Sequence, residues 1–377
     1  MLLQFMKNYF ITGATGAIGS SLVPILLLDP ETQVTLLLRA ASLGELAGRL
    51  ESLYGFWQMG PAEAAARQRV RVLRGDVTRP AFALDAIEYR QLAATSTHII
   101  HSAGNVRMNL PIEQARHSSV DSARHIIALA HGCARLEKVE FVSTVGVGGR
   151  THGKVPEEWL TAPRNFHNTY EQAKAEAEEV VRVELERGLP LTVHRPSMVV
   201  GNGSDGRIIH FQVFYHLCEF LSGRRTFGMS PDLGVARLDI VPADYVAKAI
   251  AWSSTAAAST GRIIHSCSGP ALALALDPLR ERVRRAFAEA GRRVPPLIKL
   301  PTGVFSAIIS AASLLMPADA RRAVRTLPVF LDYLATEQTF ANHRTQELLS
   351  AAGLAVPAPE QYLEQVLGYY LESLRPR

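Results

Sequence analysis

The sequence is poor in cysteine and in long hydrophobic runs, and each scarcity excludes a class of protein. Its three cysteines, Cys133, Cys218 and Cys267, are far apart, which excludes a disulfide framework and a cysteine-based metal site and favours a reducing cytoplasm. The most apolar window outside the first expected strand, residues 304–316, is too short to cross a bilayer. Only seven residues precede that first strand, so we expect no signal peptide.

The charge balance is only mildly basic. The 40 lysine and arginine residues exceed the 35 acidic residues and give a formal net charge of +5. This excess is modest and dispersed, so it suits an anionic small molecule or an acidic carrier protein and does not indicate a nucleic-acid partner. With 377 residues, 47% of them hydrophobic, the chain has room for one large α/β domain and a smaller appendage.

Apolar runs alternate with helical stretches over the first 200 residues, which predicts a Rossmann-type, doubly wound parallel sheet in an α/β protein. The expected strands are residues 8–12, 33–39, 69–77, 97–104, 138–149 and 190–201. We assign residues 1–202 to this Rossmann domain and expect segments within 235–270 to complete its sheet. Residues 203–377, which begin with an amphipathic helix at 206–223, form a smaller, mostly helical substrate-binding region.

The segment "TGATGAIG" places Gly13, Gly16 and Gly19 three residues apart, between an apolar strand and an apolar helix. The first glycine permits a sharp turn, the second lets backbone approach a pyrophosphate, and the third allows close packing of helix on strand. This context predicts a dinucleotide cofactor. The expected cofactor-binding residues of this turn and of later strand ends are Gly13, Thr15, Gly16, Ala17, Ile18, Gly19, Ser102, Ala103, Gly104, Pro196 and Ser197.

Positive charge follows the second expected strand, where an NAD enzyme usually carries an acid. Arg39 can bind a 2′-phosphate on the adenosine ribose, so it favours NADPH over NADH. Arg49, on the next helix, is either a second phosphate ligand or a solvated surface residue. Asp76, followed by Val77 after the third strand, either accepts a hydrogen bond from the adenine amino group or caps a turn.

Tyr170 and Lys174 are four residues apart and therefore share one face of a helix. A phenol is a weak acid, and a nearby lysine cation lowers its pKa and can bind the nicotinamide ribose. After a phosphate-binding turn and five strands, this pair indicates hydride transfer. Ser143 or Thr144, at the end of the fifth strand, can bind a substrate carbonyl oxygen, and Arg195, Pro196 and Ser197 are expected to line the nicotinamide end.

Residues 8–270 together resemble the extended branch of the short-chain dehydrogenase/reductase superfamily, and are most similar to its fatty acyl-CoA reductase and thioester reductase group, with a male-sterility-type NAD-binding domain. "LLLRA", "HSAGNVRMN", "STVGVGG" and "LDIVPADYVAKAI" carry the similarity, with "FANHRTQELLSAAGL" near the C-terminus. The resemblance implies that Thr144, Tyr170 and Lys174 are catalytic and that Arg39 and Arg49 contact the 2′-phosphate. Ser119 stands where the family commonly has an asparagine.

The resemblance implies NADPH-dependent reduction of an acyl thioester to the aldehyde, and leaves open whether the aldehyde is reduced onward to the alcohol. The thioester is carried by CoA or by an acyl or peptidyl carrier protein supplied in trans. The alternatives are an NADP-dependent dehydrogenase, ketoreductase or epimerase acting on a sterol, ketone or sugar nucleotide, and a non-catalytic cofactor sensor. The basic residues 280–293 either dock such a carrier or form a solvated helix face. Residues 304–316 form a buried helix, an acyl-chain wall or an interfacial membrane helix.

Overall fold

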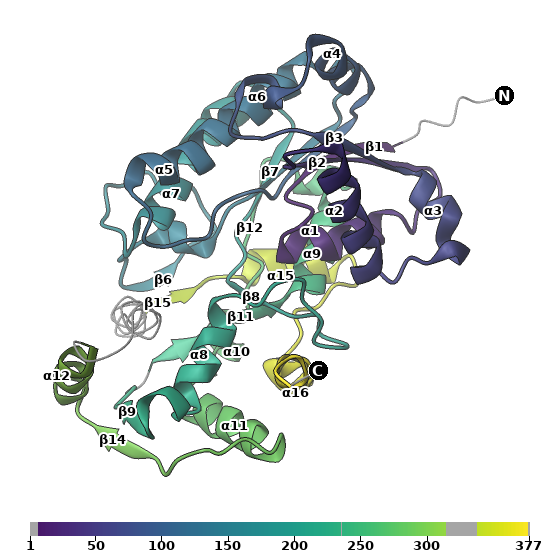
Figure 1. Cartoon of the computed structure of the whole chain (residues 1–377). Coiled ribbons are helices and arrows are strands. Elements are labelled where there is room, and N and C mark those ends of the chain that lie inside the picture. The colour runs from purple at the N-terminus through teal and green to yellow at the C-terminus, as the bar shows by residue number, and fades with distance from the viewer. Residues whose placement is uncertain (1–6, 235, 314–337, 376–377) are drawn as a thin grey trace.

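A parallel sheet of seven strands forms the centre of the computed structural model, which describes residues 7–375 except 235 and 314–337 (Figure 1). The strand order is β12-β7-β5-β4-β1-β2-β3, and every neighbouring pair is parallel. This confirms the predicted Rossmann-type sheet, and β12 brings a segment from beyond residue 260 into it. The strands are β1 (Lys7–Thr12), β2 (Thr32–Leu38), β3 (Val70–Arg74), β4 (His98–His101), β5 (Lys138–Val142), β7 (Leu191–His194) and β12 (Ile263–Ile264).

Helices cover both faces of the sheet because its strands are apolar on both sides. In β1, Tyr9 and Ile11 join one hydrophobic core while Phe10 joins another. The helices of the first core are α1 (Ala17–Leu26), α2 (Leu43–Phe56) and α9 (Ala243–Ser253), and those of the second are α4 (Ala86–Thr95), α6 (Ser122–Gly132) and α7 (Thr169–Glu186). The shorter helices are α3 (Ala64–Gln68), α5 (Ile112–Arg116) and α10 (Gly269–Leu272).

Several predicted strands are too long at their C-terminal ends. The run 190–201 is not one strand, because β7 ends at His194 and a separate strand, β8 (Met198–Val200), pairs with β11 (Ile240–Pro242) outside the main sheet. Pro196 lies in the break, where a residue without an N–H group cannot extend a ladder. The run 138–149 also ends early, because a 3-10 turn, Val145–Gly148, follows β5. These early endings form the turns at the carboxyl edge of the sheet.

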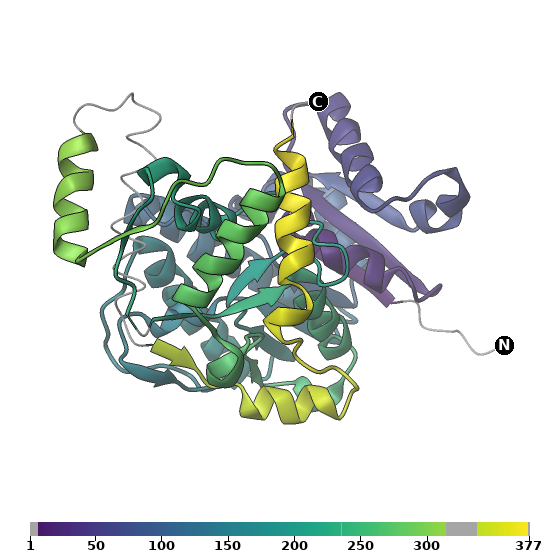
Figure 2. The same ribbon diagram turned by 90° about the horizontal axis from the view of Figure 1, so that it is seen from below.

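A third apolar core lies below the sheet and includes Phe214, Phe287 and Tyr370. It is built by α8 (Val213–Leu221), which begins later than predicted, α11 (Leu276–Glu289) and α16 (Leu363–Ser373), and α11 and α16 lie side by side in Figure 2. Short strand pairs border it: β9 (Met229–Pro231) with β14 (Ile298–Leu300), and β10 (Arg237–Leu238) with β13 (Leu274–Ala275).

Helix α12 (Thr302–Ser313) lies at the margin of the molecule in both views (Figures 1 and 2). Phe305 and Ile309 are buried, but Val304 and Ile308 are 49% and 38% exposed. The prediction of a buried helix is therefore wrong for one of its faces, because no described element covers that side. Residues 314–316 lie outside the described residues. Within the residues that the structure describes, every helix is too short or too polar to cross a membrane.

The late segment that begins at residue 338 returns to the sheet-bearing part of the chain. Strand β15 (Gln338–Phe340) pairs in parallel with β6 (Gly153–Val155), and α15 (His343–Ser350) buries Leu349 in the core shared by α1 and α9. Residues 338–350 thus pack with the Rossmann elements, although we expected them in the helical substrate-binding region.

Candidate active site

The glycine turn after β1 has the geometry that a dinucleotide requires. Gly13 has φ +81°, and a Cβ there would lie 2.5 Å from the Ala103 nitrogen. A Cβ on Gly19 would lie 2.2 Å from the Gly13 oxygen, whereas one on Gly16 would lie 3.2 Å from it. A Cβ is therefore excluded at Gly13 and at Gly19, whereas one at Gly16 would only be tight. Gly16 caps α1 without any side-chain hydrogen bond, which suits the approach of an anion to the helix N-terminus.

The remaining residues expected around this turn occupy different environments. Thr15 and Ile18 are partly exposed, whereas Ala17 is buried in the third core, with Phe214 and Tyr370. The Ser102 nitrogen donates to the Thr12 carbonyl oxygen at 3.2 Å, which brings the end of β4 beside the end of β1. The glycine turn and residues 102–104 thus share one edge of the sheet, where a cofactor crevice is expected in an open α/β fold.

Arg39 and Arg49 lie near the end of β2 but differ in their partners. Arg39 is exposed directly after the strand. Arg49, on α2, donates from Nε and Nη2 to Oε1 of Glu45 at 3.0 and 2.7 Å. The other carboxylate oxygen of Glu45 accepts from the Ala41 nitrogen at 2.7 Å. Arg49 is exposed, as its surface alternative requires, and its charge is matched by Glu45.

Asp76 caps a turn, as one of its two expected roles requires. Its Oδ1 accepts from the Thr78 nitrogen at 2.9 Å and from the Thr78 hydroxyl at 2.8 Å. The carbonyl oxygen of Val77 is 3.0 Å from Nδ1 of His125 on α6. These contacts fix the loop after β3 at the same edge of the sheet as Arg39.

Thr144, Tyr170 and Lys174 meet at the ends of β4 and β5. The Thr144 hydroxyl lies close enough to the Tyr170 phenol to lower its pKa, and Thr144 Oγ1 also accepts from the Gly146 nitrogen at 3.1 Å. The Lys174 ammonium donates to the Val142 carbonyl oxygen at 2.9 Å, and a Cβ on Gly104 would lie 3.5 Å from Lys174 Nζ. Helix α7 supplies the tyrosine and the lysine, and the turn after β5 supplies the threonine. The structure thus brings the three proposed catalytic side chains together beside the expected cofactor crevice.

Burial shifts the pKa values of this cluster in opposite directions. Burial lowers the pKa of Lys174 to about 8, with the Glu178 carboxylate opposing part of that shift. Burial raises the pKa of Tyr170 to about 12, and its hydrogen bond to Thr144 opposes part of the rise. Without a bound cofactor, Tyr170 is therefore a protonated donor at neutral pH, and the lysine cation beside it titrates just above neutrality.

Ser143 and Ser119 occupy other positions. Ser143 is buried, and its hydroxyl has no hydrogen-bond partner within the residues that the structure describes, whereas Thr144 contacts Tyr170. Ser119 is buried in a π-helical turn, His117–Asp121, and its carbonyl oxygen accepts from the Ser122 hydroxyl at 3.0 Å. The geometry thus favours Thr144 as the substrate-binding hydroxyl.

Arg195 does not line the nicotinamide end, contrary to our expectation. Its side chain is 0% exposed and donates to both carboxylate oxygens of Glu178. Nη1 also donates to the Glu158 carbonyl oxygen at 2.9 Å. Pro196 lies closer to the catalytic cluster, since its carbonyl oxygen accepts from the Val145 nitrogen at 3.1 Å, and Ser197 follows it at 9% exposure. An arginine this deeply buried requires an acid, and here the acid is Glu178.

Two buried residues beside the cluster were not singled out from the sequence. His101, at the end of β4, lies 2.8 Å from the Thr12 hydroxyl through Nδ1, and burial lowers its pKa to about 3. Glu171, next to Tyr170, accepts from the His167 nitrogen at 3.0 Å, and its Cγ would be 3.0 Å from a Cβ on Gly146. In the sequence, His101 is marked by its place at the start of the segment "HSAG". Glu171 is marked only by its position directly after Tyr170.

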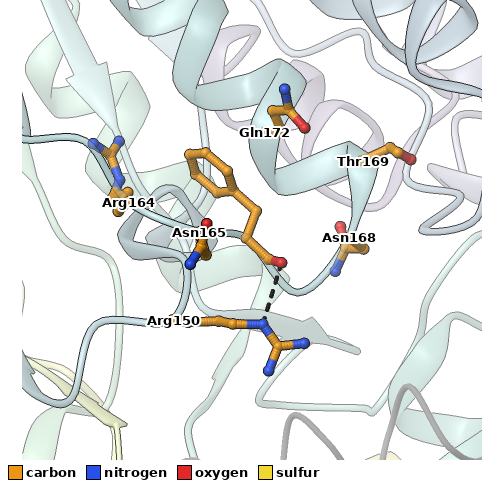
Figure 3. A pocket seen from close by; sticks show the side chains of 7 residues that line it. Arg150, Arg164, Asn165, Asn168, Thr169 and Gln172 are labelled. Atoms are coloured by element: carbon orange, nitrogen blue, oxygen red, sulfur yellow. Dashed lines mark hydrogen bonds between the residues drawn. The ribbon is translucent and has the colours of Figure 1, made fainter.

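A polar cavity of about 620 Å³ adjoins the first turn of α7, next to Tyr170 in sequence (Figure 3). Figure 3 shows Arg164 across the cavity from Thr169, with Arg150 below them, and Arg150 Nε donates to the Phe166 carbonyl oxygen at 3.3 Å. The lining residues are Arg150, Arg164, Asn165, Phe166, Asn168, Thr169 and Gln172. This lining contains no acidic residue, so the cavity suits a polar or anionic group.

The basic stretch 280–293 is neither wholly a solvated helix face nor wholly free to dock a carrier, because several of its arginines are bound within the protein. Arg280 is buried and donates to Asp277 at 2.6 Å, Arg284 donates to the Pro295 carbonyl oxygen at 2.6 Å, and Arg292 donates to that of Leu374 at 2.5 Å. These three cations therefore stabilise the third core, which α11 and α16 build. Arg285 and Arg293 are the exposed arginines of the stretch.

Comparison with known proteins agrees with this geometry. The sequence model of the family described as Male sterility protein matches residues 11–250. The chain belongs to this family. The resemblance read from the motifs is thereby confirmed, including the NAD-binding character of the fold. Isonitrile lipopeptide synthase of Streptomyces coeruleorubidus is 28% identical over 242 residues, which are 64% of this chain and 16% of that synthase. The chain therefore spans a small part of this curated relative.

Solved structures share the fold at low identity. The terminal R domain from the myxalamid PKS-NRPS biosynthetic pathway has a TM-score of 0.80 and 24% identity, covering 99% of this chain and 92% of that one. A thiolation-reductase di-domain from an archaeal non-ribosomal peptide synthetase has a TM-score of 0.76 and 18% identity, covering 98% of this chain and 75% of that one. The likeness extends through the helical C-terminal region, beyond the residues matched by the family.

Proposed function

We propose that the protein reduces an acyl thioester to an aldehyde, with NADPH as the hydride donor. The observation that carries this proposal is the meeting of Thr144, Tyr170 and Lys174 beside a glycine turn in which Gly13 and Gly19 leave no room for a Cβ. The family match and the likeness to reductase domains of peptide synthetases support a thioester substrate. The thiolation-reductase pairing in one structural neighbour supports a carrier-protein-bound acyl group, and CoA is the other donor that we consider.

The residues present fit a dinucleotide. The turn of Gly13, Gly16 and Gly19 would hold the pyrophosphate, Arg39 would bind the 2′-phosphate, and Lys174 would bind the nicotinamide ribose. The bound cofactor would supply the hydride.

Thr144 and Tyr170 act on the carbonyl oxygen. As the thioester carbon accepts a hydride, its oxygen gains negative charge, and the two hydroxyl groups donate hydrogen bonds to it. Such donors stabilise the transition state more than the ground state, and each contributes about 3 kcal/mol. The proton of Tyr170 passes to the oxygen, and the cation of Lys174 stabilises the phenolate that remains. The resulting hemithioacetal then breaks its C–S bond, its hydroxyl proton passes to sulfur, and thiol and aldehyde leave.

The same residues can act on the aldehyde. A second hydride, from a second NADPH, would reach the carbonyl carbon while Tyr170 again donates its proton, which would give the alcohol. We propose that the thioester arrives on a separate carrier protein or on CoA, in the cytoplasm.

The decisive experiment measures NADPH oxidation with acyl-CoA and acyl-carrier thioesters of several chain lengths. Thiol release is read with a thiol reagent, and aldehyde or alcohol is identified by mass spectrometry. Ketone, sterol and sugar-nucleotide substrates run in parallel, and Tyr170→Phe serves as the inactive control. Stoichiometric thiol release supports the proposal. NADPH oxidation with a ketone but with no thioester would refute it and favour the ketoreductase alternative.

A further inference from the structure

We propose that Arg74, rather than Arg49, joins Arg39 as the second cation for the 2′-phosphate of NADPH. This inference rests on the proposed use of NADPH and assigns the chain's own cofactor-selecting residues. Arg74 is the last residue of β3 and stands outside the motifs that indicated a cofactor site in the sequence.

The sheet register places Arg74 next to Arg39. Strands β2 and β3 are parallel, and Leu38 is the direct partner of Arg74 in their ladder. The Gly75 nitrogen continues this ladder by donating to the Leu38 carbonyl oxygen at 3.1 Å. Since Arg39 follows Leu38, both arginines emerge at the carboxyl ends of adjacent strands, where a Rossmann fold binds the adenosine end of its cofactor.

The side chain of Arg74 points towards the loop that carries Arg39. Nη1 of Arg74 donates to the Ala41 carbonyl oxygen at 3.1 Å, and the side chain is exposed. A guanidinium has five N–H donors, and this is the hydrogen bond that Arg74 makes in the part of the chain described. The guanidinium of Arg74 is thus held at Ala41, two residues after Arg39 in the chain. Its remaining N–H donors can bind an anion.

Arg49 is occupied by an acid. Its Nε and Nη2 both bind Glu45, whose second oxygen is fixed by the Ala41 nitrogen. The Ala41 N–H and then Arg49 lower the pKa of Glu45, so this carboxylate stays ionised at neutral pH. To bind a phosphate, Arg49 would have to leave Glu45 or bring that negative charge with it.

Charge counting gives the same answer. A phosphate monoester carries about two negative charges at neutral pH. Arg39 and Arg74 supply two cations whose charge no acid is seen to match within the described residues, whereas Arg49 and Glu45 cancel. Charge-assisted hydrogen bonds from two guanidinium groups match such a dianion in charge and in geometry.

The test measures the Kd values of NADPH and NADH by calorimetry for the wild type, Arg74→Ala, Arg49→Ala and Arg71→Ala. Arg71 is the matched control, since it is exposed on the same strand and pairs with Thr35 instead. We expect Arg74→Ala to raise the Kd of NADPH about tenfold or more and to leave that of NADH unchanged, because one charge-assisted contact is lost. Arg49→Ala and Arg71→Ala should change the Kd of NADPH less than about threefold.

Two results would overturn the inference. If Arg49→Ala raises the Kd of NADPH more than Arg74→Ala does, Arg49 leaves Glu45 and is the ligand of the 2′-phosphate. If Arg74→Ala raises the Kd values of NADPH and NADH by the same factor, Arg74 only supports the loop that contains Ala41. Arg74→Lys, which keeps the charge, should retain most of the preference for NADPH. A wild type that binds NADH as tightly as NADPH would instead refute the proposed cofactor itself, whatever the variants do.

Discussion

The carboxylate of Glu178 binds the guanidinium of Arg195 through two hydrogen bonds, of 2.9 and 2.6 Å, inside the protein. Glu178 is one helical turn beyond Lys174 on α7, and Lys174 is one turn beyond Tyr170. Arg195 directly follows β7, which neighbours β5 in the sheet. The ion pair therefore ties the catalytic helix to the sheet edge where the Thr144 turn begins.

Breaking this pair should destabilise the protein strongly. Glu178→Gln leaves a buried arginine without a counter-charge, so the free energy of unfolding should fall by about 3 to 5 kcal/mol. Urea denaturation measures the change. Glu186→Gln is the control, because it removes an exposed ion pair from the same helix and should cost less than about 1 kcal/mol. Equal effects of the two substitutions would mean that Arg195 finds another partner or water.

The hydroxyl groups of the catalytic cluster should differ in their effect on rate. Thr144→Val should lower kcat about 10²- to 10³-fold, because one donor to the carbonyl oxygen is lost. Tyr170→Phe should lower kcat about 10²- to 10⁴-fold, because the proton donor is lost. Ser143→Ala, one residue away, should leave kcat nearly unchanged, because that buried hydroxyl has no partner within the described chain. A larger loss from Ser143→Ala than from Thr144→Val would reverse the assignment.

The rate should fall on the alkaline side of neutrality. Lys174 must be charged to stabilise the phenolate of Tyr170, and burial lowers the pKa of Lys174 to about 8. The cation is therefore present below that pH and is lost above it, so kcat/KM for NADPH should decline about tenfold per pH unit above about 8. Lys174→Arg keeps a charge at all these pH values and should remove the decline while lowering the rate. A wild-type profile that is flat to about pH 10 would contradict this role for Lys174.

The local patterns of the sequence predicted the sheet, the glycine turn and the shared helix face of Tyr170 and Lys174, because each depends on residues close together in the chain. Continuous apolar runs require burial on both faces, and the spacing of Tyr170 and Lys174 fixes them on one face of α7. The role of Arg195 was mispredicted because its partner Glu178 lies on another element, 17 residues away. Contacts between elements of this kind cannot be read from a local pattern.

The ion pair of Glu45 and Arg49 does follow from a local pattern. The two residues are four apart in a helix, a spacing that favours an ion pair. The strand ends were overextended for a different reason. Residues after β5 remain apolar because they form the buried 3-10 turn Val145–Gly148, so hydrophobicity alone does not mark the end of the strand.

Removing the negative charge of Glu45 should tighten NADPH binding. Glu45→Gln can still accept the Ala41 N–H, but it no longer neutralises Arg49 or repels a phosphate. We expect the Kd of NADPH to fall about threefold, a gain typical of one exposed charge, with little change for NADH. Calorimetry at low and high salt checks this, since screening should shrink the gain. A weaker Kd for both cofactors would show that Glu45 mainly holds the loop before α2.

The glycine turn offers the most direct test of how the fold and the cofactor site depend on one another. Gly13→Ala introduces a Cβ at φ +81° and 2.5 Å from the Ala103 nitrogen, and the atoms of Ala103 and Ser102 that it would meet are all backbone, so they cannot yield cheaply. The melting temperature should drop by several degrees, and the rise that we expect saturating NADPH to produce in the wild type should vanish.

Gly16→Ala separates the two effects of the turn. Its Cβ would lie 3.2 Å from the Gly13 oxygen, so the substitution should cost little stability. The Cβ would, however, stand between the protein backbone and the expected pyrophosphate, so it should weaken NADPH binding. Gly48→Ala in α2, with no atom within 4 Å, should raise stability by about 0.5 to 1 kcal/mol and leave NADPH binding intact. If Gly13→Ala has the melting temperature of the wild type, the turn after β1 adopts another conformation. The proposed binding of the pyrophosphate at this turn would then be wrong.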